Sequence, residues 1–450
     1  MKKITTGIIL VLTICMIAGC GKSAARDSYV EGTDFQYQYL DSFALLNKQA
    51  KGKKASYFVI GSYIYQLDEK AGLLTPLCNK SNCLHDKEKD EKRMEECNAY
   101  VSEDAGIAYM DGYIYTVMLK CSENDICDTL YKISEDGATK EKVYQWNGQV
   151  VDNWCVHRNV CYFVEHTYNA DGQEFYKVKK LQLGGMGKKK PKIIYEPETN
   201  ITVFAMGALS AYGNHLYINV DGAKTKDVKK VAKKDWAKKS YNKTFQYDLK
   251  KNTISEIRVP QQSETEQVST ITFWQNKLLI HVMDGEKLHQ YDAKSNVYTA
   301  DLDGKNVTVL LKDMPAYREY SSDGTYLYIS DCVEALDRIY SDPKYQYNTN
   351  QDIKKKYDFT VKIDVYDKKM KRVDQMESPI KSFPTELPYG IGERMYVLET
   401  DKSGNGVSLV YWDKKKLGTY HGKEYTFTKL LEQTYSVHDQ QQLQEESGEE

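Results

Sequence analysis

The chain has 450 residues, of which 41% are hydrophobic, and it carries 62 Lys and Arg against 64 Asp and Glu. This hydrophobic fraction is typical of a globular protein and excludes disorder along the whole chain. The net charge of -2 excludes a protein that binds nucleic acid through bulk positive charge. Tyrosine is frequent, with 37 Tyr against 11 Phe, which is typical of half-exposed β-strands.

The N-terminus predicts export and lipid attachment. Lys2 and Lys3 precede an apolar stretch over residues 8–18, which is too short to span a bilayer as a lasting helix. The stretch ends at Ile17-Ala18-Gly19-Cys20, which resembles the lipobox of bacterial lipoproteins. This resemblance implies cleavage before Cys20 and a diacylglycerol on its sulfur. An ordinary secretory signal with an incidental cysteine is the alternative.

The predicted domain order follows from this start. We expect a signal peptide over residues 1–19, a lipidated cysteine and polar tether over 20–50, and a folded domain over 51–432. Residues 433–450 are rich in Gln and Glu without periodicity and are expected to form a disordered acidic tail. The mature protein is then anchored on the outer face of the cell membrane.

A tight turn followed by an alternating strand recurs through the folded domain at intervals of about 50 to 70 residues. The copies are residues 111–115, 158–162, 213–217, 275–279, 323–328 and 392–396. Four short strands per unit are typical of a β-propeller blade, so we predict an all-β propeller of about seven four-stranded blades. Six or eight blades, or a pair of β-sandwiches, are the alternatives. The fourth strand of the first blade is expected from residues 35–43 or from residues 425–431.

Two segments resemble known families. Residues 296–306 and the strand at 307–311 resemble repeats of TolB-like and low-density-lipoprotein-receptor-like (YWTD) propellers, which commonly have six blades. The lipobox, the propeller and the cysteine segment 77–100 together resemble a family of bacterial propeller lipoproteins of unknown function. The resemblance implies a binding or assembly role with no known ligand.

Propeller geometry places the tight turns on one face of the ring and the longer connections on the other. The long connections are expected at residues 121–128, 167–173, 222–240, 334–358 and 401–406, and the link 78–97 is expected on their face. Because function concentrates in loops on a rigid scaffold, we predict that this face binds the partner.

The link 78–97 contains Cys78, Cys83, His85 and Cys97. Three thiols and an imidazole are a complete tetrahedral donor set for structural zinc, and a metal would fix a polar loop that has no core of its own. Export favours disulfides instead, and a redox or free-thiol role is the third alternative.

The other cysteines allow further bonds. Cys121 and Cys127 flank one short connection, and Cys155 and Cys161 flank a tight turn, so each pair is a candidate disulfide across antiparallel strands. Cys332 has no partner nearby in the sequence.

Two segments are candidates for the binding face. Lysines and apolar residues alternate at helical spacing near 226–239, which predicts a short amphipathic helix carrying Lys229, Lys230 and Trp236. It would meet an anionic polymer or headgroup, or else simply cap its blade. Tyr340, Tyr345 and Tyr347 offer an aromatic surface for a sugar ring or a peptide, or else pack within their loop.

No catalytic signature favours an enzyme. The chain lacks a Gly-x-Ser-x-Gly elbow, a His-Glu-x-x-His helix and a phosphate-binding glycine loop. The sequence therefore favours a non-catalytic protein that binds a peptide, a glycan or an envelope partner, with no nucleic acid and no certain cofactor. The alternative is a carbohydrate-active lyase or hydrolase that uses carboxylates and histidines such as His166 and His281 at the channel mouth.

Overall fold

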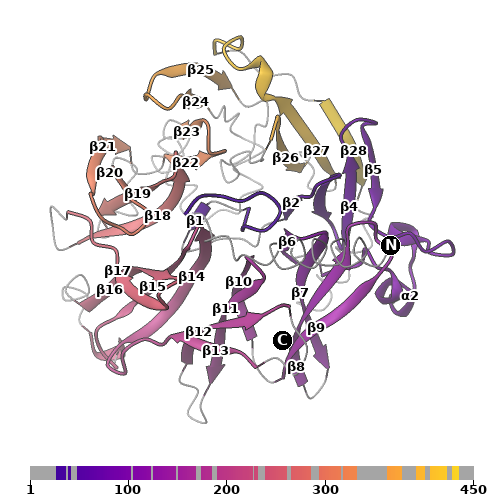
Figure 1. Ribbon diagram of the computed structural model, residues 1–450, viewed down its shortest axis with the longest axis horizontal. Helices are drawn as coiled ribbons and strands as arrows, with labels where there is room; N and C mark the ends of the chain where they lie inside the picture. Colours follow the sequence, from indigo (N-terminus) through magenta and orange to yellow (C-terminus); the bar gives the residue numbers. More distant parts are fainter. Residues whose placement is uncertain are drawn as a thin grey trace, which may run out of the picture.

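The computed structural model describes residues 27–36, 39–41, 48–102, 105–122, 125–147, 150–168, 174–184, 190–226, 228–231, 239–260, 265–284, 293–315, 318–331, 362–377, 392–400, 406–422 and 428–434. Nearly all elements in these ranges are strands, and their sheets stand around a common centre like the blades of a propeller (Figure 1). The predicted all-β propeller is therefore confirmed.

Six sheets contain four consecutive antiparallel strands each, ordered outward from the centre. Blade 1 comprises β2 (Gln49–Lys51), β3 (Ser56–Ile60), β4 (Tyr63–Asp68) and β5 (Leu73–Pro76). Blade 2 comprises β6 (Ile107–Met110), β7 (Tyr113–Ser122), β8 (Asp125–Ser134) and β9 (Lys140–Asn147). Blade 3 comprises β10 (Val150–His157), β11 (Val160–Tyr168), β12 (Glu174–Gln182) and β13 (Lys192–Tyr195). Blade 4 comprises β14 (Thr202–Tyr212), β15 (His215–Ala223), β16 (Ser240–Asp248) and β17 (Thr253–Glu256). Blade 5 comprises β18 (Glu266–Trp274), β19 (Lys277–Asp284), β20 (Lys294–Ala300) and β21 (Thr308–Pro315). Blade 6 comprises β22 (Glu319–Ser322), β23 (Leu327–Asp331), β24 (Lys362–Tyr366) and β25 (Arg372–Glu377).

A further sheet has three strands, β26 (Arg394–Thr400), β27 (Gly406–Asp413) and β28 (Thr428–Thr434). The described residues thus form six complete blades, one of the counts that the sequence left open, and a three-stranded sheet in place of a seventh four-stranded blade. This sheet lies between blades 6 and 1 in the ring (Figure 1). Met395 shares a core cluster with Tyr328 of blade 6, and Tyr396 packs edge-on against Phe58 of blade 1 with ring centroids 5.0 Å apart.

Each blade buries both of its faces against its neighbours. Ile107 and Tyr109 of β6 pack into the cluster of blade 1, whereas Ala108 and Met110 pack into the cluster shared with blade 3. Alternate residues of a strand point to opposite faces of its sheet, so a strand between two blades must be apolar on both. This requirement explains why β6 is buried along its whole length.

Neither predicted source supplies the fourth strand of blade 1. That strand is β2, which lies on the inner edge and pairs with β3. From the first predicted source, β1 (Tyr39–Asp41) instead adds a fifth strand to blade 5 by pairing with β18. From the second, β28 pairs with β27.

The tight turns between first and second strands define one side of the ring, here called the turn face. Arg158 and Asn159 both have positive φ, at 48° and 67°, as do Gln275 and Asn276 at 53° and 60°. Two left-handed residues make a turn whose twist matches that of the flanking strands. Because the strands run antiparallel, the connections between second and third strands lie on the opposite side, here called the loop face.

Two predicted loop-face elements differ from expectation. Residues 121–128 form no long connection, because β7 runs to Ser122 and β8 starts at Asp125. The predicted helix near 226–239 is described only as a 3-10 turn, η2 (Val228–Lys230), since residues 227 and 232–238 lie outside the described ranges. The ends of that connection are joined where the Lys224 N–H donates to the Lys239 carbonyl at 2.7 Å.

Gly137, in the turn after β8, provides a test of how adjacent blades fit together. Its φ is +70°, and a Cβ there would lie 2.7 Å from the Leu77 carbonyl carbon of blade 1. Gly112 in the same blade has φ +84° with nothing within 4 Å of such a Cβ. We expect Gly112→Ala to lower the free energy of unfolding by about 1 kcal/mol through backbone strain, and Gly137→Ala by about 1–3 kcal/mol more.

Urea unfolding followed by tryptophan fluorescence measures both costs. Equal losses for the two variants would contradict the close approach of the Gly137 turn to blade 1.

Candidate functional site

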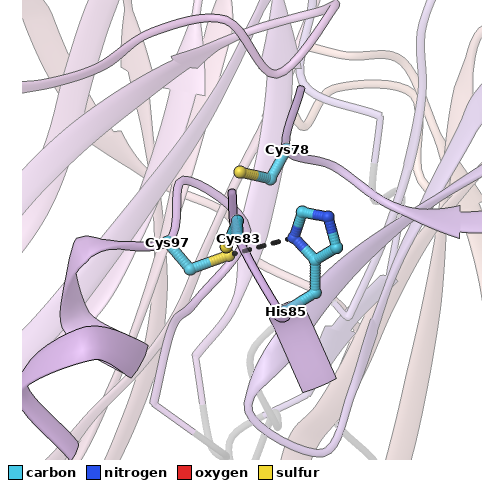
Figure 2. A group of neighbouring side chains, drawn as sticks. All are labelled: Cys78, Cys83, His85 and Cys97. Carbon is cyan, nitrogen blue, oxygen red and sulfur yellow. Dashed lines mark hydrogen bonds between the residues drawn. The ribbon is translucent and has the colours of Figure 1, made fainter. Parts of the chain in front are cut away.

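The link between blades 1 and 2 brings four predicted donor residues together. Cys78 follows the end of β5, Cys83 precedes the 3-10 turn η1 (His85–Lys87), and Cys97 caps the end of α2 (Glu91–Glu96). Figure 2 shows the three sulfur atoms and the imidazole of His85 pointing toward one another.

The four side chains form a compact donor group. One ligand atom from each residue lies within 4.8 Å of the others, and Cys97 Sγ is 3.7 Å from His85 Nδ1 (Figure 2). Cys97 is buried and the other three are half-buried. His85 has φ 54°, a left-handed conformation that is costly for a residue with a side chain. The group could hold a metal ion.

The thiols of this group differ in their ionisation. Burial raises the pKa of Cys78, but hydrogen bonds from the backbone N–H groups of Lys80 and Asn98 outweigh it, so the pKa is lowered overall. Burial, together with the neighbouring thiols of Cys83 and Cys78, raises the pKa of Cys97 to about 12. Three thiolates at this spacing therefore repel one another unless a cation lies between them.

The segment around the donors has almost no core of its own. None of the described side chains from residue 79 to residue 96 is buried. The segment is fixed by a few polar contacts, including the Tyr65 hydroxyl, which donates to Asp86 Oδ2 at 2.9 Å, and Lys80 Nζ, which donates to the Glu96 carbonyl. An open cavity of about 630 Å³ borders the group and is lined in part by Cys83, Arg93 and Cys97.

The donor group lies at the outer rim of the ring. Figure 1 shows α2 outside blade 1, beside β4 and β5. Cys78 contacts Gly137 of the turn after β8, and the Asn79 N–H donates to the Gly137 carbonyl at 3.4 Å. The outer strands of a twisted blade lean toward the neighbouring blade, which places the end of β5 against this turn.

A second polar site joins the N-terminal segment, residues 27–36, to the turn face. The Asp111 N–H of blade 2 donates to the Gly32 carbonyl at 2.8 Å, and the Arg158 N–H of blade 3 donates to the Thr33 carbonyl at 2.8 Å. The Asn214 N–H of blade 4 donates to Asp27 Oδ1 at 3.1 Å. The segment thus contacts the turns of three consecutive blades, although it lies within the predicted tether 20–50.

A buried charge pair holds this segment. The Asp34 carboxylate is fully buried and accepts from Arg158 Nε at 2.7 Å and from Nη2 at 2.9 Å. Arg158 also donates to Asn214 Oδ1 at 2.8 Å and to the Ser28 carbonyl at 3.0 Å. Two-point pairing of a guanidinium with a carboxylate compensates for the burial of both charges.

His157 completes the site in its neutral form. The Phe35 N–H donates to His157 Nδ1 at 3.0 Å, and Nε2 lies 2.9 Å from the Gly213 carbonyl, so Nε2 carries the proton. Burial lowers the pKa of His157 to about 4, although the carboxylate of Asp34 opposes this. Sequence reasoning missed Asp34, His157 and Arg158; the apolar residues Tyr29 and Phe35 in a polar stretch were the available signal.

The structure does not bring Cys155 and Cys161 together. In the β10–β11 pair Cys155 is opposite Tyr162 and Cys161 is opposite Val156, so the two thiols face different core clusters. Cys127 is opposite Lys120 with a free thiol, and the side chain of Cys121 lies outside the description.

Most residues of the predicted binding face lie outside the described ranges, namely Trp236, Tyr340, Tyr345 and Tyr347, as do Cys20 and Cys332. Lys229 and Lys230 lie in η2, where Lys230 is exposed.

His166 and His281 are buried in blades 3 and 5, where they pack against Tyr176 and Tyr320 respectively. Burial lowers the pKa of His281 to about 4.

No protein-family model matches the chain, and no curated protein matches it. A solved prolyl endopeptidase matches with a TM-score of 0.51 and 10% identity over 89% of this chain and 51% of that one. The chain therefore spans about half the length of that peptidase. The likeness shows a shared fold alone.

Two further solved structures give weaker matches. An oligogalacturonate lyase in complex with manganese has a TM-score of 0.42 and 11% identity over 89% of this chain and 91% of that one. The β-propeller domain of the Trilobed protease from Pyrococcus furiosus has a TM-score of 0.42 and 15% identity over 69% and 81%.

In the described part of the chain, no helix has both the length and the apolar character that crossing a membrane requires.

The pKa of His157 predicts an acid-sensitive attachment of the N-terminal segment. The pKa of His157 is about 4 in the folded protein and about 6.5 when unfolded. The stability that comes from burying the neutral imidazole is therefore fully present above pH 6.5 and is lost as the pH falls toward 4. We expect the wild type to lose about 2 kcal/mol more than His157→Gln between pH 7 and pH 5, measured by urea unfolding. Parallel pH profiles for the two proteins would contradict this role of His157.

Proposed function

We propose that this protein is a lipoprotein anchored through Cys20 on the outer face of the cell membrane. It binds a peptide, glycan or envelope partner through its loop face, without catalysis. The observation that carries the proposal is the attachment of the N-terminal segment to the turn face. The lipobox-like Ile17-Ala18-Gly19-Cys20 and the resemblance to propeller lipoproteins of the TolB-like and YWTD kind support it.

The position of the N-terminal segment gives the anchor a direction. Asp27 is hydrogen-bonded to Asn214 on the turn face, and residues 21–26 separate it from Cys20. This stretch reaches about 25 Å when fully extended. A lipid on Cys20 therefore keeps the turn face near the bilayer and directs the loop face away from it.

The centre of the ring is a less suitable binding place than the loop face. β1 pairs with β18 on the inner edge of blade 5, register Tyr39 to Thr272, and also contacts β14 of blade 4. The N-terminal chain thus occupies part of the space where a propeller enzyme would gather its titratable groups. Loops displayed on a rigid scaffold commonly carry binding, which favours the connections of the loop face.

Attachment through Cys20 has a direct test. We expect Cys20→Ser to move the protein from the membrane fraction to the soluble fraction, because the acyl chains supply the membrane affinity. Cys15→Ser, in the same apolar stretch, is the matched control and is expected to stay with the membrane. The measurement is fractionation with mass spectrometry of the N-terminal peptide. An unlipidated Cys20 in the wild type would contradict the anchor.

The orientation can be tested within one blade. An epitope tag inserted between residues 288 and 289, in the loop-face connection of blade 5, is compared with one between Asp303 and Gly304 in its turn on the other side. In protein reconstituted into vesicles, we expect Fab binding to the second tag to be at least about 10-fold weaker, because the bilayer shields the turn face. Both tags should bind equally in detergent, and equal binding on vesicles would overturn the orientation.

Binding without catalysis is tested on the purified lipoprotein with arrays of envelope glycans and peptides. Retention of a ligand without change in its mass supports the proposal. Turnover of a bound oligosaccharide would favour the alternative, a carbohydrate-active lyase or hydrolase.

A further inference from the structure

We propose that Cys78, Cys83, His85 and Cys97 bind one zinc ion, which fixes the link between blades 1 and 2. The site lies at the rim, beside β4 and β5, and its function does not depend on the anchor or on the loop face (Figure 1).

The donor chemistry and spacing fit zinc. Three thiolates and one imidazole complete a tetrahedral set, and zinc–ligand distances of about 2.0–2.3 Å place neighbouring donors about 3.5–3.8 Å apart. Cys97 Sγ and His85 Nδ1 are 3.7 Å apart, and all four donor atoms lie within 4.8 Å of one another. A small inward movement of the side chains would complete the site. Soft sulfur ligands favour zinc over calcium or magnesium, which prefer oxygen.

The segment between the donors needs such a bond. Its described side chains from residue 79 to residue 96 include none that is buried, and Leu84 is 55% exposed. A polar segment of this length cannot offset its ordering entropy by apolar burial. Metal binding supplies folding free energy directly in small domains that lack a core.

The convergence of four donors distinguishes zinc from a disulfide. A disulfide joins two sulfur atoms about 2.05 Å apart and would leave one thiol and the imidazole without a role. His85 is held in a left-handed conformation at φ 54°, and its ring faces the sulfur of Cys97 (Figure 2). Backbone strain of this kind persists where the surrounding structure requires it, and a metal ligand gives that requirement.

The metal would join two parts of the ring. Cys78 follows the outer strand β5 and contacts Gly137 of blade 2. Two residues after Cys97 lies the buried Ala99, whose carbonyl accepts from the Ile64 N–H of β4 at 2.8 Å. One ion therefore fastens both ends of the link to the boundary between the two blades.

The test uses the full-length lipoprotein purified in detergent from cells grown with zinc. Elemental analysis is expected to give about one zinc ion per chain, and X-ray absorption at the zinc edge should indicate three sulfur neighbours and one nitrogen neighbour. Chelation should release the backbone of the link and speed tryptic cleavage after Lys87, Lys89 and Lys92 by at least about 10-fold.

Variants separate the site from the rest of the chain. Cys83→Ser should lose the zinc, whereas Cys127→Ser, which removes a free thiol elsewhere, should retain it. His85→Cys should retain zinc with four sulfur neighbours, which keeps the proposal testable if Cys83→Ser fails to fold. A disulfide between two of these cysteines mapped without reduction in zinc-free wild type would overturn the proposal. Full zinc content in Cys83→Ser would also overturn it.

Discussion

The structure depends on one requirement, that every inner strand bury side chains on both of its faces. In β6, Tyr109 packs toward blade 1 and Met110 toward blade 3. A sheet with two apolar faces cannot stand alone in water, and only a ring gives each sheet two neighbours while removing exposed faces. The ring then sorts the connections onto two sides, because those between first and second strands lie on the turn face and those between second and third strands lie on the loop face. The chemical properties of the protein follow from this sorting.

The two sides of the ring differ in what the chain adds to them. The turn face carries the N-terminal segment, held by the buried pair of Asp34 and Arg158 and by a neutral His157. Breaking such a pair leaves an uncompensated buried charge, so the segment behaves as part of the folded ring and not as a tether. Under the proposed lipid anchor on Cys20, this attachment would fix the orientation of the ring, with the turn face toward the bilayer and the loop face away from it.

The outer rim carries a third kind of chemistry. The link after β5 is polar and without a core, yet its four sulfur and nitrogen donors converge on one point. In a propeller the blade-to-blade links are the places where the chain leaves the shared core, so they need local fastening. At the link between blades 1 and 2 the fastening would come from metal ligands.

The sequence by itself determined the repeating strands and their turns, because hydrophobic alternation and left-handed turn residues such as Asn159 are local properties. It predicted the recurring turn at residues 158–162, which is the β10–β11 turn of blade 3, and it grouped Cys78, Cys83, His85 and Cys97 correctly. Only the tertiary structure decided the partners of strands far apart in the chain, such as β1 with β18, and the opposite facing of Cys155 and Cys161. It alone placed the N-terminal segment on the turn face. Register and long-range pairing depend on the packing of whole blades, which no short stretch of sequence encodes.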